Sequence, residues 1–169
     1  GNGDEFGIHI SYSYDGKNPL GTGGALKKAI RLLDDNFYIL YGDSFLPVCF
    51  STVNDAYVNN DKSALMTVLY NSNKWDKSNV LFNNKEILEY NKHQPNPYMR
   101  HIDYGLAVVS KEIFDHYKAN ITFDLADVFH QLSKVGQLAG FEVHQRFYEI
   151  GSHTGLKETE EYFLTKEKT

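Results

Sequence analysis

Asp43 and Glu149 are the two residues whose type and position most directly suggest chemistry. Asp43 comes directly after an apolar run, residues 36–41, and Glu149 stands near the end of the last strand-like run, just before Gly151. Magnesium prefers oxygen ligands and is usually held by one or two carboxylates together with substrate phosphates. The pair could therefore share one Mg²⁺. Each residue alone also has a simpler interpretation, an Asp that begins a turn and a Glu exposed on a strand.

A glycine turn and one lysine could supply binding groups for an anion. Gly21-Thr22-Gly23 opens a helix-like segment, where backbone N–H groups and the positive end of the helix dipole suit an anionic or polar ligand. A tight strand-to-helix connection explains the same glycines equally well. Lys92 precedes a proline-containing loop and could pair with a phosphate, although most such lysines are solvated surface residues.

Composition and charge describe an ordinary globular chain of a single domain, residues 1–169. Hydrophobic residues make up 41% and charged residues 23%, and the net charge is −5. The acidic balance argues against a nucleic-acid binder, and no apolar run is long enough to cross a membrane. Cys49 is the only cysteine, which excludes an internal disulfide and predicts a cytoplasmic protein. The sequence leaves open whether the protein forms a homo-oligomer.

Hydrophobic periodicity predicts an α/β domain. Alternating or continuous apolar runs indicate strands, and spacings of three and four residues indicate helices. Residues 36–41 are apolar almost throughout, which predicts a strand covered on both faces. The expected strands are 6–14, 36–41, 64–70, 80–82, 87–90, 101–109, 141–144 and 147–150, and the expected helices are 20–33, 48–59, 111–117, 124–135 and 154–164. In such sheets ligands bind at the carboxyl ends of strands, where Asp43 and Glu149 are expected.

Five segments, taken in order, resemble the sugar-1-phosphate nucleotidyltransferases. They are Pro19-Leu-Gly-Thr-Gly-Gly-Ala-Leu26, Phe37-Tyr-Ile-Leu-Tyr-Gly-Asp-Ser44, Glu89-Tyr-Asn-Lys92, His101-Ile-Asp-Tyr-Gly-Leu-Ala-Val108 and Phe147-Tyr-Glu-Ile-Gly-Ser152. The fourth and fifth segments are most similar to the heptose-1-phosphate guanylyltransferase branch. The resemblance implies a three-layer α/β/α, Rossmann-like nucleotide-diphospho-sugar transferase fold with a mixed sheet.

The resemblance also implies an activity and its residues. An NTP and a heptose- or hexose-type sugar 1-phosphate would give an NDP-sugar and pyrophosphate for lipopolysaccharide or capsule precursors, with GTP suggested by the heptose-like segments. By resemblance, Gly21, Thr22 and Gly23 would bind the nucleotide. Asp43, Lys92 and Glu149 would be catalytic, with Asp43 and Glu149 holding Mg²⁺. The sugar would lie against Asp103, Tyr104 and Gly105.

One departure from the family pattern bears on activity. The family begins with a strand and a glycine-rich loop that carries an Arg, followed by a Lys-Pro element, and these hold the triphosphate. Neither segment is found in this sequence, which predicts an N-terminally truncated member without the first strand and signature loop. The alternative function is a non-catalytic module of the same fold that binds a nucleotide sugar or pairs with another subunit.

Overall fold

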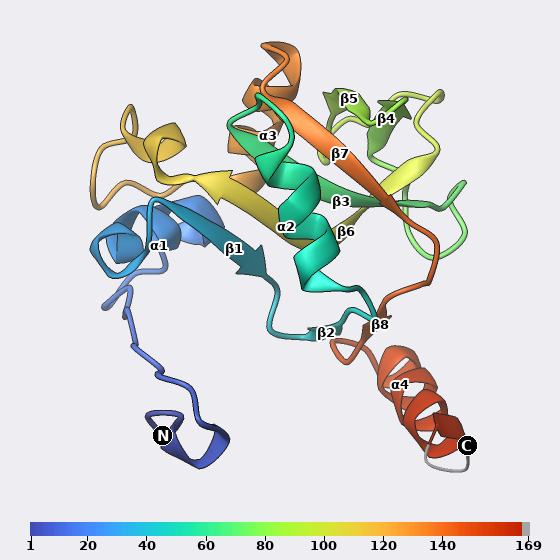
Figure 1. Ribbon diagram of the computed structural model, residues 1–169, viewed down its shortest axis with the longest axis horizontal. Coiled ribbons are helices and arrows are strands. Elements are labelled where there is room, and N and C mark those ends of the chain that lie inside the picture. The colour runs from blue at the N-terminus through green and yellow to red at the C-terminus, as the bar shows by residue number, and fades with distance from the viewer. Residues whose placement is uncertain (167–169) are drawn as a thin grey trace.

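The computed structural model describes residues 1–166, and within them six strands form one mixed sheet (Figure 1). The strand order is β1-β6-β3-β7-β5-β4, and a separate two-stranded ladder joins β2 to β8. The strands are β1 Asn36–Leu40, β2 Ser44–Phe45, β3 Ala64–Tyr70, β4 Val80–Asn83, β5 Glu86–Tyr90, β6 His101–Ser110, β7 Leu138–Val143 and β8 Tyr148–Glu149. The helices are α1 Gly21–Ala29, α2 Phe50–Val58, α3 Leu125–Lys134 and α4 His153–Lys166.

Strand direction brings the carboxyl ends of three strands to the same side of the sheet. β3 is parallel to β7, whereas β6 is antiparallel to both β3 and β1. It follows that β1, β3 and β7 run the same way. Their carboxyl ends lead into the loops that begin at Tyr41, Asn71 and His144, and ligands of α/β sheets bind at such an edge.

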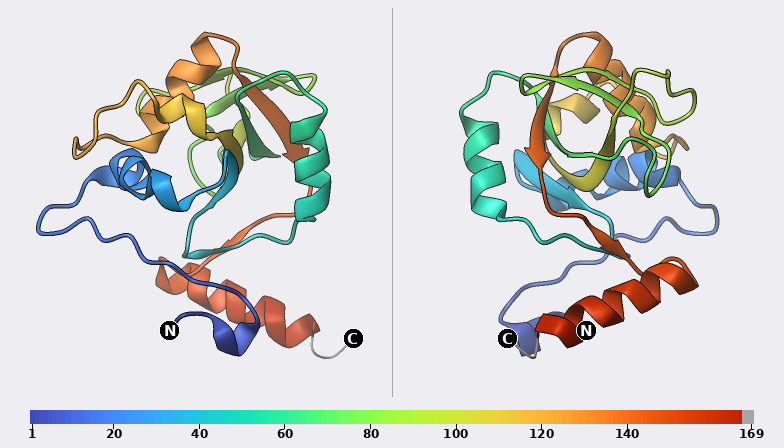
Figure 2. Two further views of the ribbon diagram at one scale, coloured as in Figure 1. Left: turned by 60° about the vertical axis from the view of Figure 1, so that its left-hand side comes forward. Right: turned by 90° about the vertical axis from the view of Figure 1, so that its right-hand side faces the viewer.

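Helices cover both faces of the sheet, which confirms the three-layer α/β/α expectation (Figure 2). Side chains alternate along β3, so that Met66 and Val68 pack under α3 while Leu65 and Leu69 pack under α2 with Val53. α3 begins where predicted because the Asp124 side chain accepts a hydrogen bond from Ala126 N–H, at 2.9 Å.

Several of the predicted elements form close to their expected limits, and three expectations are wrong. Residues 6–14 form no strand. A period-two pattern needs a neighbouring strand for its backbone N–H and C=O groups, and none pairs with this segment within residues 1–166. Phe6 and Tyr14 are about three-quarters exposed. β1 is an edge strand, and it exposes Tyr38 and Leu40 instead of covering both faces.

The helix expected at 111–117 is also shorter than predicted. Ser110 does cap it, accepting from Glu112 N–H, but only a 3-10 helix forms, Lys111–Phe114. Two further 3-10 turns lie at Asp4–Phe6 and Ile30–Leu32. No helix among residues 1–166 is long and apolar enough to cross a bilayer.

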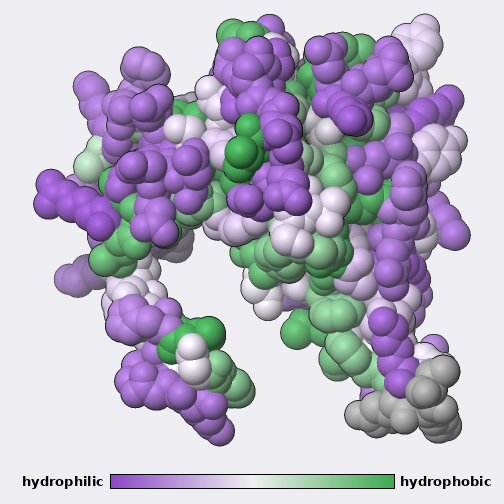
Figure 3. All heavy atoms as spheres, in the orientation of Figure 1, coloured by the Kyte–Doolittle hydropathy of each residue, from purple (hydrophilic) through white to green (hydrophobic). Residues whose placement is uncertain are grey.

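β2, β8 and α4 form a projecting part of the molecule. The ladder carries α4 away from the main sheet, and the N-terminal arm leaves the body separately (Figure 1). A hydrophobic patch lies over β2 in Figure 3, where Phe45 is packed against the aromatic rings of Tyr162 and Phe163. These ring contacts fix α4 to the β2–β8 ladder.

Candidate functional site

A cavity of about 600 Å³ opens at the carboxyl edge of the sheet. Its size is typical of small-molecule sites. Five residues predicted from the sequence line it, namely Lys92, Asp103, Tyr104, Gly105 and Glu149. The complete lining is Tyr41, Ser44, Lys74, Trp75, Asp76, Asn79, Tyr90, Lys92, Ile102, Asp103, Tyr104, Gly105, Arg146, Phe147, Glu149, Ser152, Thr154, Gly155 and Glu158.

The carboxylates of Asp43 and Glu149 lie close together, although they are far apart in the sequence. The β2–β8 ladder pairs Ser44 with Glu149, and Ile150 N–H donates to the Asp43 carbonyl at 2.9 Å. A methyl group built on Gly151 would lie 3.1 Å from Glu149 Oε2 and 3.4 Å from Asp43 Oδ2. Oxygen atoms of both side chains therefore face the same point.

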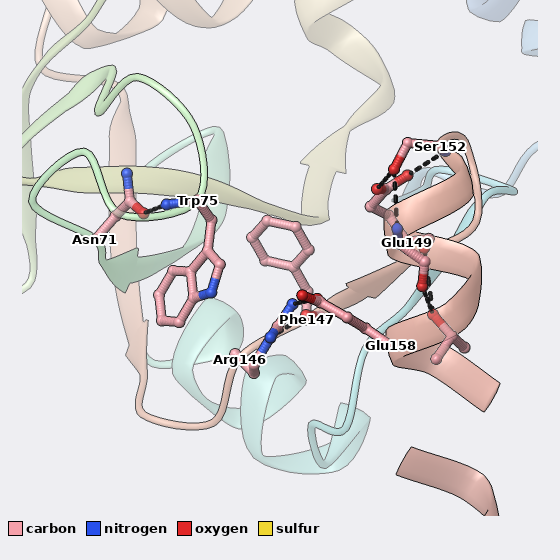
Figure 4. A network of polar contacts seen from close by, with 9 residues as sticks. Asn71, Trp75, Arg146, Phe147, Glu149, Ser152 and Glu158 are labelled. Carbon is pink, nitrogen blue, oxygen red and sulfur yellow. Dashed lines mark hydrogen bonds and ion pairs between the residues drawn. The ribbon is translucent and has the colours of Figure 1, made fainter. Parts of the chain in front are cut away.

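Local hydrogen bonds orient the Glu149 carboxylate. Its Oε2 accepts from Gly151 N–H at 2.6 Å and from Ser152 N–H at 3.2 Å, and Ser152 Oγ donates to Oε1 at 2.7 Å (Figure 4). A Cβ atom at Gly155 would overlap the Glu149 carboxylate, so glycine is needed there. A carboxylate has about four acceptor positions, so these bonds leave capacity for a cation while fixing the geometry.

Two carboxylates suit magnesium better than a metal that needs a full protein cage. No group of three or more His, Cys, Asp or Glu in the part of the chain that the structure describes could hold a metal ion. Magnesium keeps several waters or phosphate oxygens and needs only one or two carboxylates. The donor set of Asp43 and Glu149, both oxygen ligands, fits that chemistry.

A bulge in β6 turns Asp103, Tyr104 and Gly105 into the cavity. Met66 of β3 pairs with Ala107 of β6, whereas Val68, two residues further along β3, pairs with Asp103, four residues away along β6. Gly105 has a φ of 99°, which non-glycine residues rarely adopt, and its N–H donates to Asp103 Oδ1 at 2.9 Å. Bulges of this kind re-aim side chains next to binding sites.

Asp103 and Lys92 carry the charge in this part of the cavity. Burial raises the pKa of Asp103 from 3.8 to about 6, against the opposing effects of the Gly105 N–H and the Lys92 ammonium. Lys92 is exposed, and no ion pair joins it to a carboxylate within residues 1–166. Its charge is therefore available to a ligand.

The glycine turn lies outside the cavity lining and packs against another loop. Gly23 and Gly24 N–H groups both donate to the Phe123 carbonyl, at 3.1 and 3.2 Å. Thr22 Oγ1 donates to Asp124 at 2.8 Å and accepts from Leu125 N–H at 2.9 Å. In this arrangement, Gly21, Thr22 and Gly23 support the start of α3, and their nucleotide-binding role stays a prediction.

Sequence reasoning missed several cavity residues. Trp75, Asn79 and Arg146 line it although no motif marks them, and Tyr41 lines it although its segment, 37–44, indicated only Asp43 as a site residue. Asn79 Oδ1 accepts from Asp103 N–H at 3.0 Å, which holds the bulge in place. Burial, followed by the charges of Asp103 and other carboxylates, raises the pKa of Tyr41. Tyr41 directly follows β1, so the carboxyl-end rule could have singled it out.

Comparison with known structures identifies the fold. A protein of Bacillus anthracis assigned as a glucose-1-phosphate thymidylyltransferase superposes with a TM-score of 0.76 at 18% identity, over 94% of this chain and 66% of that one. HddC of Yersinia pseudotuberculosis superposes with a TM-score of 0.69 at 20% identity, over 87% and 64%. The inositol-1-phosphate CTP transferase of T. maritima gives 0.64 at 19% identity, over 80% and 58%. The chain has the sugar-1-phosphate nucleotidyltransferase fold.

Sequence comparison agrees with this nucleotidyltransferase fold. The chain is 27% identical over 150 residues to the D-glycero-alpha-D-manno-heptose 1-phosphate guanylyltransferase of Campylobacter jejuni, a match that covers 88% of this chain and 65% of that protein. The chain thus spans less than two thirds of the length of this relative. No family model matches the sequence. The resemblance identified from the five segments is confirmed.

Proposed function

We propose that the protein is a sugar-1-phosphate nucleotidyltransferase that forms an NDP-sugar and pyrophosphate. The observation that carries the proposal is the convergence of Asp43 and Glu149 beside a cavity lined by Lys92, which forms no ion pair with a carboxylate of residues 1–166. Two carboxylates that can hold a cation and one ammonium group that can bind an anion support a reaction between two phosphates.

In the proposed reaction, a phosphate oxygen of the sugar 1-phosphate attacks the α-phosphorus of the NTP. A new bond forms between that oxygen and the α-phosphorus, and the bond to the bridging oxygen breaks, so that pyrophosphate leaves with the electron pair. The attacking phosphate is already ionised near neutral pH, so no strong general base is needed. Catalysis then rests mainly on positioning and on offsetting negative charge.

Each charged residue has a separate task in this proposal. Asp43 and Glu149 would hold Mg²⁺, which supplies positive charge next to the phosphates when it is bound. Lys92 binds the phosphate of the sugar substrate as a point charge. Asp103 accepts from Gly105 N–H through one oxygen, and its second oxygen would bind sugar hydroxyl groups. Tyr104 and Gly105 would line the same site, Tyr104 as a residue that is only 2% exposed.

For the substrates, we propose a heptose-type sugar 1-phosphate and GTP. The relative from Campylobacter jejuni acts on a heptose 1-phosphate as a guanylyltransferase, and HddC has been solved in complex with GMP-PN. A role in cell-surface polysaccharide synthesis and a cytoplasmic location follow from the same reasoning and stay predictions.

The test is pyrophosphate release by the purified protein with Mg²⁺, each NTP and a set of sugar 1-phosphates. Asp43→Asn should reduce turnover by roughly 100-fold or more, because a charge-stabilising group of this kind is worth about 3 kcal/mol. Asp61→Asn, at an exposed carboxylate on the surface, is the control. Near-normal turnover in Asp43→Asn would refute the assignment. Ligand binding without any pyrophosphate release would instead favour a non-catalytic module.

A further inference from the structure

Arg146 is held in one orientation in the cavity wall by contacts on several sides. Its Nε donates to the Phe147 carbonyl at 3.1 Å, and its Nη2 donates to Glu158 Oε2 at 2.6 Å. The guanidinium also lies over two aromatic rings, 4.7 Å from the centroid of Tyr148 and 5.4 Å from that of Trp75. A guanidinium fixed in this way loses little further freedom when it binds a ligand.

The same arrangement leaves hydrogen-bonding groups unused. A guanidinium has five N–H donors, and within residues 1–166 only two bonds of Arg146 are made. Among residues 1–166, Glu158 likewise accepts through Oε2 and makes no hydrogen bond through Oε1. Both side chains line the cavity, and 30% of Arg146 and 42% of Glu158 remain exposed. Donors and acceptors therefore stand side by side in the cavity wall.

The charges of Arg146 and Glu158 and the contacts of the Trp75 ring favour a neutral ligand over an anion or a nucleobase. Since Glu158 neutralises Arg146, an added anion would gain little attraction and would be repelled by the carboxylate. Lys74 and Arg146 already lie over the Trp75 ring, at 4.7 and 5.4 Å from its centroid, so the indole is not a free surface for a nucleobase. A neutral group with adjacent hydroxyls can both accept from the guanidinium and donate to the carboxylate.

The position of the pair relative to the carboxylates fits the far end of a sugar. In Figure 4, Arg146 and Trp75 lie on one side of Phe147, whereas Glu149 and Ser152 lie on the other. The backbone N–H of Trp75 donates to Asn71 Oδ1 at 3.1 Å, which fixes the loop that carries the indole. A ligand whose phosphate is near Glu149 and Lys92 could extend its other end toward Arg146 within the same cavity.

We infer that Arg146 and Glu158 form a subsite for the exocyclic hydroxyl chain of the sugar, so that the enzyme prefers sugar 1-phosphates with an extended, vicinal-diol side chain. The inference rests on the proposed function and deepens it. Arg146 is the specificity-determining residue, and Trp75 and Glu158 hold its guanidinium in place.

The test compares the binding of two sugar 1-phosphates to the purified protein by calorimetry. The first is a heptose 1-phosphate with an exocyclic diol, and the second is mannose 1-phosphate, which is one carbon shorter. The wild-type protein should bind the heptose compound about 10-fold more tightly, the effect of roughly one good pair of hydrogen bonds. Arg146→Met should reduce this preference to about 2-fold or less.

Two further variants separate recognition from folding. Arg146→Lys keeps the charge opposite Glu158 but loses the planar fork, so the preference should fall while thermal unfolding changes little. Lys157→Met removes an exposed cation from α4, the helix that carries Glu158, and should leave the preference for the heptose compound unchanged. Thermal unfolding of each variant shows which of them is folded.

Different outcomes refute different statements. If both sugar phosphates bind and Arg146→Met weakens them equally, the subsite is wrong and the proposed function stands. If Arg146→Met selectively weakens the binding of GTP, this part of the cavity wall contacts the nucleotide and the inference is wrong. If the wild-type protein binds neither sugar phosphate, the proposed function fails and the inference fails with it.

Discussion

Replacing Asp103 by Asn should stabilise the folded protein above about pH 6 while weakening its use of substrate. Burial raises the pKa of this carboxyl from 3.8 to about 6. The folded state therefore holds the proton more tightly than the unfolded state does. The resulting stability is fully present below the unfolded pKa, and it is lost as the pH rises through the folded pKa.

The expected difference in the free energy of unfolding follows from the size of the Asp103 pKa shift. One pKa unit corresponds to about 1.36 kcal/mol, so a shift from 3.8 to about 6 costs roughly 3 kcal/mol once Asp103 is ionised. Asn avoids this cost because it carries no charge, and its carbonyl oxygen can still accept from Gly105 N–H. The variant and the wild-type protein should therefore be about equally stable near pH 4, and the difference should approach about 3 kcal/mol near pH 7.5.

Urea unfolding at a series of pH values measures this difference. Asp61→Asn is a matched control because the Asp61 side chain is 88% exposed and lies outside the cavity. A difference between Asp103→Asn and wild type that stays constant from about pH 4 to about pH 7.5, or that shrinks as the pH rises, would refute the reasoning. Retention of a costly carboxylate is typical of a group kept for binding or catalysis.

Three other substitutions test the site. Lys92→Gln should raise the KM for the sugar 1-phosphate by roughly 10-fold, and an unchanged KM would exclude its phosphate role. Gly155→Ala should destabilise the protein by about 1–3 kcal/mol and reduce activity, because its methyl group overlaps Glu149, whereas Gly42→Ala, with open space around it, should do neither. Thr22→Val should lower the free energy of unfolding in urea by about 1–2 kcal/mol, because two hydrogen bonds at the start of α3 disappear. Thr22→Ser keeps the hydroxyl group and should retain most of this stability.

Local sequence patterns predicted the elements that are stabilised by their own periodicity and caps. α3 is amphipathic and has Asp124 at its start, and the apolar run at 64–70 forms the buried central strand β3. The segment at 6–14 has an equally regular pattern, yet it forms no strand. A strand depends on hydrogen bonds to a neighbour, which no local pattern supplies.

The sequence predicted only part of the candidate site, because the rest depends on contacts between segments that are distant in the chain. The five segments indicated the residues Lys92, Asp103 and Glu149, and the cavity contains all three. Arg146 and Trp75 carry no motif, because their importance arises from a ring contact between separate loops and from the ion pair of Arg146 with Glu158 of α4. Such contacts become visible only when the loops are placed in space.

The sequence by itself determined the α/β class, the helical and strand character of most segments, and the residue types available for chemistry, since these follow from side-chain size, polarity and short-range spacing. Only the tertiary structure decided that Asp43 and Glu149 meet at Gly151 and that a bulge in β6 turns Asp103 into the cavity. Both depend on the pairing of strands that are distant in the chain. The physical reason is that strand register fixes which side chains face one another.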